Sequence, residues 1–423
     1  MKVMYFSKKE NLLRFLYTIG IYIANFHLKI IALFNHKLKL GVKGRAKTFQ
    51  ILENAIQAND TTMWFHCASL GEYEQGLPVF KELRNEHPNH KIVLTFFSPS
   101  GYEIRKNTDI ADVVVYLPMD TKHNAKRFLD VVHPELTIFV KYDIWPNYLI
   151  ELKKRRLKAI LISALFRKNQ SYFKAHGAML REALSAFQHI FVQDKMSEKL
   201  LKTINFNNVT IAGDTRFDRV SDQLNQNNTL PFIETFKGND LCVVIGSSWP
   251  EDEELLIPFI NANASKNVKY IIAPHTIKSN QINDLISKLN VKTVRYSEMD
   301  GKNLADYSVF IIDTIGLLSK IYSYADIAYV GGAMGTTGLH NILEPAVFGV
   351  PIIIGKNYDK FPEAKQMINE AGVVSILNYN ELDNTLSGLI NASSKRLELG
   401  QMNGQFITSN KGAVIRIVDS LHI

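Results

Sequence analysis

The fold is decided by the stretch Trp64-Phe65-His66-Cys67-Ala68-Ser69-Leu70-Gly71-Glu72. An apolar run ends at Cys67, a turn of small residues follows, and a helical pattern occupies residues 73–87. A buried strand that passes through a short turn into a helix is the repeating unit of a parallel α/β sheet.

The same unit recurs along most of the chain. Expected strands lie at 63–67, 92–96, 113–116, 136–140, 159–163, 190–193 and 209–211, and after an Asn/Gln-rich break at 242–245, 270–273, 291–294, 309–312, 327–330 and 351–354. Two such halves predict two doubly wound, Rossmann-like domains with a cleft between the carboxyl ends of their strands. We expect an N-terminal segment over 1–47, a first domain over 48–220, a linker over 221–238 and a second domain over 239–423.

Composition supports a globular protein of two or three domains. The chain has 423 residues, of which 46% are hydrophobic and 21% charged. Its two cysteines, Cys67 and Cys242, are far apart in apolar runs, which excludes a disulfide framework and a zinc cluster and indicates a reducing compartment.

The positive charge is concentrated at the N-terminus. Residues 1–47 carry ten Lys or Arg and a single Glu, whereas the whole chain has a net charge of only +8. A nucleic-acid enzyme would carry basic surface through its folded body. We therefore expect no nucleic-acid partner, and a membrane surface as the polyanion that this segment meets.

The apolar part of the N-terminal segment is residues 15–28, which is short for a membrane span. One narrow polar stripe, formed by Arg14, Thr18, Asn25, Lys29 and His36, runs along an otherwise apolar helix. This pattern predicts a helix that lies in the membrane interface with the stripe toward the headgroups. A helix docked on the protein's own core and a true span are the alternatives.

Glu72 is the first candidate for chemistry. It lies where the helix begins after the first strand, and Gly71 beside it allows close approach to the backbone. Such a carboxylate can take a proton from an incoming hydroxyl group. Alternatively, it only favours the helix N-terminus.

A glycine-rich loop is the second candidate site. Residues 329–345 read as a strand, a loop with four glycines and a helix start, and contain Gly338, His340, Asn341 and Glu344. Backbone N–H groups at a helix N-terminus bind anions, His340 and Asn341 add donors, and Glu344 can accept from a ribose diol. A structural turn is the alternative.

Two further strand ends carry polar residues that can contact a phosphate. They are Gly246-Ser247-Ser248 and the loop that ends at His275. Alternatively, the first loop only caps the next helix, and His275 is structural, as a lone His more often is. No two Asp residues stand two positions apart, and the sequence has no metal-ligand motif. A reaction without a metal or other cofactor is therefore expected.

These blocks together resemble the 3-deoxy-D-manno-octulosonic acid (Kdo) transferases of lipopolysaccharide synthesis, an inverting family of the GT-B type. The resemblance runs from about residue 40 to 400. The matching blocks are Gly44-Arg45, Ser69-Leu70-Gly71-Glu72, Ser98-Pro99-Ser100-Gly101, Trp145-Pro146-Asn147, Gly213-Asp214, Phe217-Asp218 and the block from Gly338 to Pro345.

The resemblance implies a reaction and a place in the cell. Glu72 would be the general base that activates the acceptor hydroxyl for attack on CMP-Kdo, the co-substrate. The acceptor would be the lipid A precursor (lipid IVA), at the cytoplasmic face of the inner membrane. Residues implied on the acceptor side are Ser69, Gly71, Ser98 and Ser100; those implied on the donor side are Gly246, Ser247, Ser248, His275, Gly338, His340, Asn341 and Glu344.

The chain departs from the family pattern at one place that matters below. Lys141 and Asp143 stand where the family commonly has two glutamates. Other readings of the sequence are a GT-B enzyme that uses a UDP-sugar, a sugar-nucleotide epimerase, or a sugar-nucleotide binding protein without a catalytic base.

Overall fold

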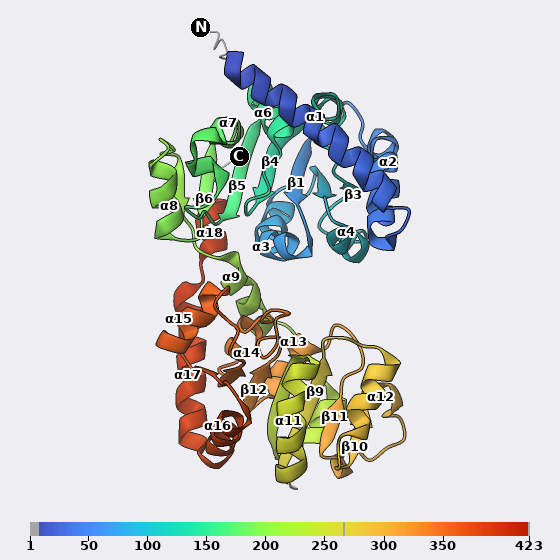
Figure 1. The fold of residues 1–423 in the computed structure, drawn as a ribbon, viewed down its shortest axis with the longest axis vertical. Coiled ribbons are helices and arrows are strands. Elements are labelled where there is room, and N and C mark those ends of the chain that lie inside the picture. Colours follow the sequence, from blue (N-terminus) through green and yellow to red (C-terminus); the bar gives the residue numbers. More distant parts are fainter. Residues whose placement is uncertain (1–7, 265–266, 422–423) are drawn as a thin grey trace. The chain divides into compact units, whose positions relative to one another are not determined.

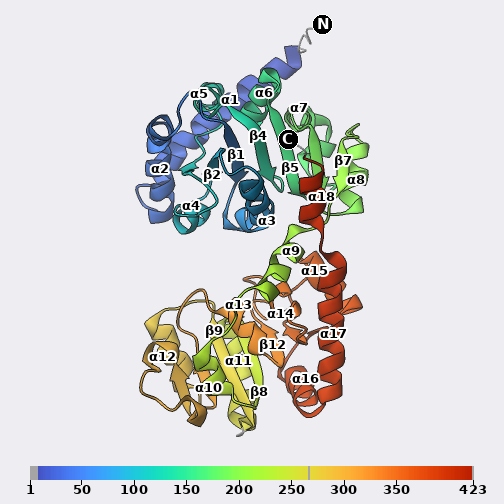
Figure 2. The same cartoon turned by 180° about the vertical axis from the view of Figure 1, so that it is seen from behind.

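The computed structural model describes residues 8–264 and 267–421 (Figures 1 and 2). The chain divides into two compact units. Val220–Lys411 form the second unit, and the residues before and after this range form the first. Each unit is built on one seven-stranded sheet.

The sheet of the first unit is parallel throughout and has the order β3-β2-β1-β4-β5-β6-β7. Its strands are β1 (Thr62–Cys67), β2 (Lys91–Phe96), β3 (Val113–Tyr116), β4 (Pro134–Val140), β5 (Lys158–Ala164), β6 (His189–Val192) and β7 (Val209–Ile211). The central strands are buried along almost their whole length. Parallel strands covered on both faces read as continuous apolar runs, which is why the sequence predicts all seven within about two residues.

Helices cover both faces of this sheet (Figures 1 and 2). The helices that begin in this unit are α1 (Lys8–Ile31), α2 (His36–Ala55), α3 (Leu70–Glu86), α4 (Pro99–Arg105), α5 (Lys122–Val132), α6 (Pro146–Arg155), α7 (Ala178–Leu184), α8 (Lys195–Lys202), α9 (Thr215–Ser221), which runs across the unit boundary, and α18 (Ala413–Asp419). Side chains of Asn35, Thr121 and Asp194 cap the first turns of α2, α5 and α8.

The second unit repeats the architecture with the parallel order β10-β11-β9-β8-β12-β13-β14. Its strands are β8 (Leu241–Ser248), β9 (Val268–Pro274), β10 (Thr293–Arg295), β11 (Val309–Ile311), β12 (Ile327–Val330), β13 (Ile352–Ile354) and β14 (Val373–Ser375). Its helices are α10 (Pro231–Lys237), α11 (Pro250–Asn263), α12 (Ser279–Ser287), α13 (Leu318–Ile321), α14 (Leu343–Ala346), α15 (Pro362–Glu370), α16 (Tyr379–Asn391) and α17 (Ser393–Asn410).

The unit boundaries differ from the predicted ones at two places. The expected linker over 221–238 contains α10, whose Ile233 and Phe236 are fully buried in the second unit. The last helix, α18, falls in the expected second domain but packs on α3 of the first unit. Asp218 accepts hydrogen bonds from the backbone N–H groups of Gly412 and Ala413 and so fixes the start of α18.

Helix α1 lies against α2 and α7, and its polar stripe is turned the opposite way from the prediction. Arg14 forms an ion pair with Glu182 of α7, and Thr18 and Asn25 are partly covered by the protein. Only the distal members of the stripe, Lys29 and His36, are exposed. The prediction that this stripe faces lipid headgroups is therefore wrong for its first half.

The outward face of α1 is apolar. We call it the apolar face, and it consists of Phe15, Leu16, Ile19, Tyr22, Ile23, Phe26, Ile30 and Ile31, each 40–63% exposed. The following turn adds Phe34, which is 88% exposed. No helix within residues 8–264 and 267–421 combines the length and the hydropathy that a bilayer span requires.

Candidate active site

The connections of the first sheet reverse direction between β1 and β4. The chain leaves β1 toward β2 and β3, whereas β4 leads to β5, β6 and β7 on the other side. In doubly wound sheets, ligands bind outside the carboxyl ends of the strands at such a switch point. The segments that leave these two strands carry Glu72 and Asp143, respectively.

Glu72 is the third residue of α3, and Ser69 is the residue before the helix. The Ser69 hydroxyl does not cap the helix backbone; it donates a hydrogen bond to the Glu72 carboxylate. Gly71 is exposed, and a Cβ added there would meet only the Ser69 hydroxyl oxygen, at 3.8 Å. The carboxylate is thus oriented by a neighbour on a turn that leaves room for a substrate.

Ser98 and Ser100 begin the next helix, α4, beside this turn. The backbone N–H of Ser98 donates to the carbonyl of Ala68 over 2.7 Å, so the turns after β1 and β2 are joined. Ser98 Oγ lies 2.9 Å from Ser100 Oγ and accepts from the Ser100 N–H. Both serines serve the start of α4, and both remain partly exposed.

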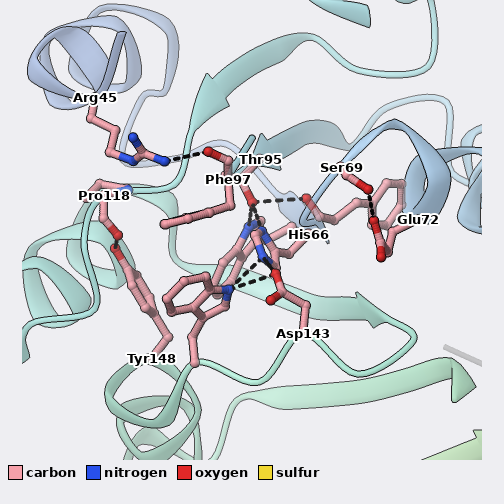
Figure 3. A network of polar contacts seen from close by, with 12 residues as sticks. Arg45, His66, Ser69, Glu72, Thr95, Phe97, Pro118, Asp143 and Tyr148 are labelled. Atoms are coloured by element: carbon pink, nitrogen blue, oxygen red, sulfur yellow. Dashed lines mark hydrogen bonds and ion pairs between the residues drawn. The ribbon is translucent and has the colours of Figure 1, made fainter. Parts of the chain in front are cut away.

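A buried hydrogen-bond network lies under this edge of the sheet (Figure 3). His66 is fully buried; its Nδ1 is 2.7 Å from Oγ1 of Thr95, and its Nε2 is 2.6 Å from Oδ2 of Asp143. Nε1 of Trp64 donates to the same Thr95 oxygen over 2.8 Å. A carboxylate can only accept, so we assign a proton to Nε2 of His66, which donates to Asp143, and Nδ1 then accepts from the Thr95 hydroxyl. The indole N–H of Trp145, which lies 2.9 Å from Nε2 and 2.8 Å from Oδ2 of Asp143, goes to the carboxylate.

Asp143 is held from a second direction by Trp145. The indole N–H of Trp145 donates to Asp143 Oδ2 over 2.8 Å, and its ring packs on Phe97 with centroids 4.6 Å apart. Phe97 in turn lies under the guanidinium group of Arg45, which donates to the Phe97 carbonyl. One oxygen of Asp143 is thus fixed by two donors on the buried side, and the carboxylate stays partly exposed at the switch point.

The Cys67 thiol is excluded as a nucleophile at this edge. It is fully buried, and burial raises its pKa well above the ordinary value. The thiol therefore stays protonated, and the reactive form of cysteine is the thiolate. Of the nearby ionisable groups, Glu72 and Asp143 remain as candidates.

The second sheet has its switch point between β8 and β12. Ser247 and Ser248 end β8 and Trp249 follows them, and the glycine-rich loop 331–342 follows β12. Ser247 adopts a left-handed backbone conformation with φ of 53°. Such conformations are uncommon for residues with a side chain and concentrate at functional sites.

Asp252 joins the two sides of this second switch point. It is fully buried and accepts hydrogen bonds from the N–H of Trp249 (2.9 Å), the hydroxyl of Tyr329 (2.8 Å) and the N–H of Gly332 (2.8 Å). Burial raises the pKa of Asp252. The carboxylate fixes the start of α11 and the start of the glycine-rich loop with the same two oxygens.

The glycine-rich loop uses many of its own backbone donors. The N–H groups of Gly331, Gly338 and His340 bond to carbonyls of Gly246, Gly332 and Gly331, and Gly332 N–H goes to Asp252. Gly332 has φ of +95°, and a Cβ there would lie 2.1 Å from the Gly338 carbonyl oxygen. The predicted backbone anion site therefore has fewer available N–H groups than the sequence indicates.

The helix after this loop is short. Helix α14 has four residues, so Glu344 lies in its first turn and the helix dipole is small. Nδ2 of Asn341 donates to Oε1 of Glu344 over 3.1 Å, while Asn341 Oδ1 accepts from the N–H of Leu343. The two predicted donor residues are thus brought into direct contact.

Three aromatic rings stack at this edge. Trp249 lies on His275 with centroids 4.4 Å apart and planes 18° apart, and the His275 ring is 4.6 Å from that of His340. Burial lowers the pKa of His340 to about 4, with a smaller contribution from His275, and burial lowers that of His275 as well. Both imidazoles are neutral at physiological pH.

The remaining predicted donor residues divide into packing and exposed positions. Gly246 lies inside β8, where a Cβ would clash with the Tyr322 hydroxyl oxygen at 1.8 Å, so its role is packing. Ser248 is buried and its hydroxyl donates to Glu253. Ser247 is the member of this strand end that is open to a ligand.

A cavity of about 750 Å³ opens beside Trp249 between α11 and α12. Its polar lining includes the carboxylates of Glu253, Glu254 and Asp284, and its Lys288 is paired with Asp284. A surplus of carboxylates repels an anionic group. This cavity is therefore excluded as the place of a phosphate.

Comparison with known proteins points to one family. The family described as 3-deoxy-D-manno-octulosonic-acid transferase (kdotransferase) matches residues 42–219, which form most of the first unit. A protein of this name from Haemophilus influenzae is 29% identical over 394 residues, which cover 89% of this chain and 90% of that protein. One from Aquifex aeolicus is 27% identical and covers 79% of this chain and 87% of its own length.

The chain is similar to Kdo transferases along most of its length. This confirms the resemblance drawn from the sequence blocks. Solved structures confirm the two-sheet α/β fold of the GT-B class. UDP-GlcNAc 2-epimerase from Neisseria meningitidis has a TM-score of 0.60 at 15% identity, covering 85% of this chain and 99% of its own. MurG from Acinetobacter baumannii has a TM-score of 0.53 at 12% identity, covering 85% and 99%.

Several residues of the candidate site escaped prediction. His66, Thr95 and Trp249 were not singled out for chemistry, and Asp143 was noted only as a departure from the family pattern. Their partners lie 29 to 91 positions away in the sequence, so local patterns do not reveal them. The order of the strands in the sheet could have revealed His66 and Asp143, because it places the residues after β1 and β4 side by side.

Proposed function

We propose that this protein is an inverting glycosyltransferase that moves Kdo from CMP-Kdo to the lipid A precursor, lipid IVA, in lipopolysaccharide synthesis. Glu72 carries the proposal: it lies at the switch point of the first sheet, oriented by Ser69 and beside the open backbone of Gly71. Similarity to Kdo transferases supports the donor and the class of acceptor.

In the proposed reaction, the Glu72 carboxylate takes the proton of the acceptor hydroxyl group. The hydroxyl oxygen forms a bond to the anomeric carbon of Kdo while the bond from that carbon to the CMP phosphate breaks. The bonding electron pair leaves with CMP, and attack from the opposite face inverts the anomeric centre. General-base assistance of this kind contributes about 10²–10⁴-fold to rate.

On the acceptor side, Asp143 complements Glu72. Its outer oxygen can accept a hydrogen bond from a second sugar hydroxyl, because His66 and Trp145 hold the other oxygen. Ser69, Gly71, Ser98 and Ser100 line the two joined turns and can contact the acceptor. A carboxylate fixed by two donors positions a substrate better than a free one.

On the donor side, we assign the phosphate to His275, His340, Gly338 and Ser247, and the ribose to Glu344 with Asn341. The imidazoles are neutral, so they act as hydrogen-bond donors and not as ions. One phosphate charge can be met by such donors without a metal ion or other cofactor. CMP-Kdo is a co-substrate in this scheme.

We place the protein at the cytoplasmic face of the inner membrane. The apolar face of α1 is a contiguous hydrophobic surface at helical spacing, which marks an interaction site. Beside it, α2 exposes Lys37, Lys39, Lys43 and Lys47, and each lysine near an anionic bilayer contributes about 1 kcal/mol of attraction. Apolar and basic surfaces next to each other fit a bilayer with anionic headgroups.

Vesicle flotation tests the membrane assignment. The triple change Phe15→Ser, Ile19→Ser and Phe26→Ser should abolish binding to vesicles that contain anionic lipid. The matched control is Leu397→Ser with Ile415→Ser, two apolar residues that are 63% and 65% exposed elsewhere. If the triple variant still floats with the vesicles, the apolar face does not bind lipid. The same holds if the variant keeps its vesicle binding but no longer forms a dimer.

Product analysis tests the reaction. Purified protein is offered CMP-Kdo or a panel of UDP-sugars together with a tetraacylated bisphosphoryl disaccharide, and the mass of the lipid is measured by mass spectrometry. We expect addition of Kdo from CMP-Kdo alone. Transfer from a UDP-sugar, epimerisation of one, or binding without turnover would each overturn the proposal.

A further inference from the structure

His340 meets Trp249 at the second switch point. The indole N–H of Trp249 lies 3.1 Å from Nε2 of His340 and is directed at it. An indole N–H has no lone pair to offer and can only donate. Nε2 must therefore carry the lone pair, and the single proton of the neutral imidazole lies on Nδ1.

Both ends of this hydrogen bond are fixed by one carboxylate. Oδ2 of Asp252 accepts from the backbone N–H of Trp249 and from that of Gly332, over which the His340 ring lies. The Trp249 ring is further held by stacking on His275. Asp252 therefore fixes the backbone of Trp249, and stacking on His275 fixes the orientation of its indole toward His340.

The Nδ1–H of His340 is left available. Among the described residues it has no hydrogen-bond partner, and His340 is partly exposed. The neighbouring backbone N–H groups of Gly331, Gly332, Gly338 and His340 are already used within the protein. An anion at this loop must therefore rely on side-chain donors to a large extent.

We propose that Trp249 is a positioning residue that fixes His340 in the Nδ1–H tautomer, so that His340 presents a neutral N–H donor to the phosphate of the sugar nucleotide. The proposal rests on the proposed function for the identity of the nucleotide. The tautomer itself and the recognition of a phosphate group do not depend on which sugar is transferred.

The tautomer is measured in the full-length protein without ligand. ¹⁵N-histidine NMR distinguishes a protonated ring nitrogen from an unprotonated one, and the His340 signals are assigned by their loss in His340→Asn. We expect a protonated Nδ1 and an unprotonated Nε2 in the wild type. Trp249→Phe, which keeps the stacked ring and removes the donor, should convert His340 to a mixture of tautomers.

The control is Tyr296→Phe, an aromatic change in the same unit at a ring that packs on Phe232. It should leave the His340 signals unchanged. A protonated Nε2 in the wild type, or identical His340 signals in wild type and Trp249→Phe, would overturn the inference whatever the enzyme transfers.

Binding of inorganic phosphate and of CMP then tests the role. The side-chain amide of Asn places an N–H near the position of Nδ1, and that of Gln near Nε2. We expect His340→Asn to keep affinity within about threefold and His340→Gln to lose about tenfold, the order of a hydrogen bond to a charged group. Trp249→Phe should weaken binding in the wild-type background and have no effect in His340→Asn.

The two proposals fail in different ways. Equal affinities of the Asn and Gln variants, or an equal effect of Trp249→Phe in both backgrounds, would refute the positioning role. The expected pattern with phosphate, combined with no Kdo transfer, would refute the proposed function and leave this inference standing.

Discussion

The Tyr17 hydroxyl donates a hydrogen bond to Oδ2 of Asp120 over 2.7 Å and so attaches α1 to the first unit. Asp120 is fully buried and also accepts from the backbone N–H groups of Asn147 and Tyr148. These are the second and third residues of α6, whose own N-cap residue, Trp145, has no side-chain cap. Asp120 thus caps the N-terminus of α6 although it lies in another segment, and the hydrogen bond from Tyr17 holds its carboxylate in place.

Tyr17→Phe should destabilise the first unit, because it removes one partner of a buried carboxylate. Losses of this kind cost about 1–3 kcal/mol, which lowers the melting temperature by several degrees in a domain of this size. Tyr22→Phe is the matched control on the same helix, since Tyr22 is 55% exposed. Equal melting temperatures of the two variants in calorimetry would contradict the assignment.

Asp120 should also make stability depend on pH. Burial raises its pKa to about 6, from about 3.9 in the unfolded chain. Between these values the folded state holds a proton that the unfolded state has lost. The stabilisation of the folded state by this proton is therefore fully present below about pH 4 and is lost as the pH rises through about 6.

Asp120→Asn removes this titration. The difference in free energy of unfolding between wild type and variant should change by on the order of 2 kcal/mol between about pH 4 and pH 6 and stay constant above about pH 7. Urea unfolding of both proteins across this range gives the measurement. Parallel pH profiles would show that Asp120 titrates alike in both states.

Glu72→Gln tests the general base. The amide keeps the size of the side chain and the contact with Ser69, so folding and donor binding should persist while turnover falls about a hundredfold or more. Glu82→Gln, an exposed position on the same helix, should stay fully active. If Glu72 serves only the helix start, the variant loses about 0.3–1 kcal/mol of stability and keeps its rate.

Glu344→Ala should weaken binding of CMP-Kdo about ten- to a hundredfold, the value of a hydrogen bond between a carboxylate and a ribose hydroxyl. Glu344→Gln keeps the size of the side chain but loses the charge, and should fall in between. Glu370→Ala, at an exposed position of the same unit, is the control. Unchanged affinity by calorimetry would leave Glu344 with a role only in holding Asn341.

Excess EDTA should change turnover by less than about twofold, which corresponds to roughly 0.4 kcal/mol in the barrier. The reason is that one phosphate charge can be met by neutral N–H donors at the glycine-rich loop. The assay compares rates before and after dialysis against EDTA. A loss that magnesium or manganese restores would show that a cation takes part.

The sequence predicts the two sheets well because both consist of parallel strands covered on two faces. Such strands are continuous apolar runs, and short turns between them leave little ambiguity. Strand β14 (Val373–Ser375) escapes prediction because it has only three residues and its last one, Ser375, interrupts the apolar run. The predicted unit boundaries are misplaced because α18 packs through contacts nearly 200 positions away, such as Gly412 with Asp218.

Candidate site residues can be proposed from the sequence where a carboxylate and a turn coincide in one short stretch, as at Glu72 and Glu344, and their roles stay predictions. They are not predictable where function depends on partners distant in sequence, as for Asp143 with His66 or His340 with Trp249. The stripe on α1 shows a different limit. Helical spacing defines two faces, but contacts with residues distant in the sequence, such as the Arg14–Glu182 pair, reveal which one meets the protein.

The return of α18 to the first unit has a consequence for synthesis on the ribosome. Its Val414 and Ile417 are buried in the same core as Phe65 and Phe80, which lie near the other end of the chain. A nascent chain that has completed Arg219 therefore still lacks part of this core, and the whole second unit must be made before that part arrives. The unit made first is finished last, only after α18 has left the exit tunnel.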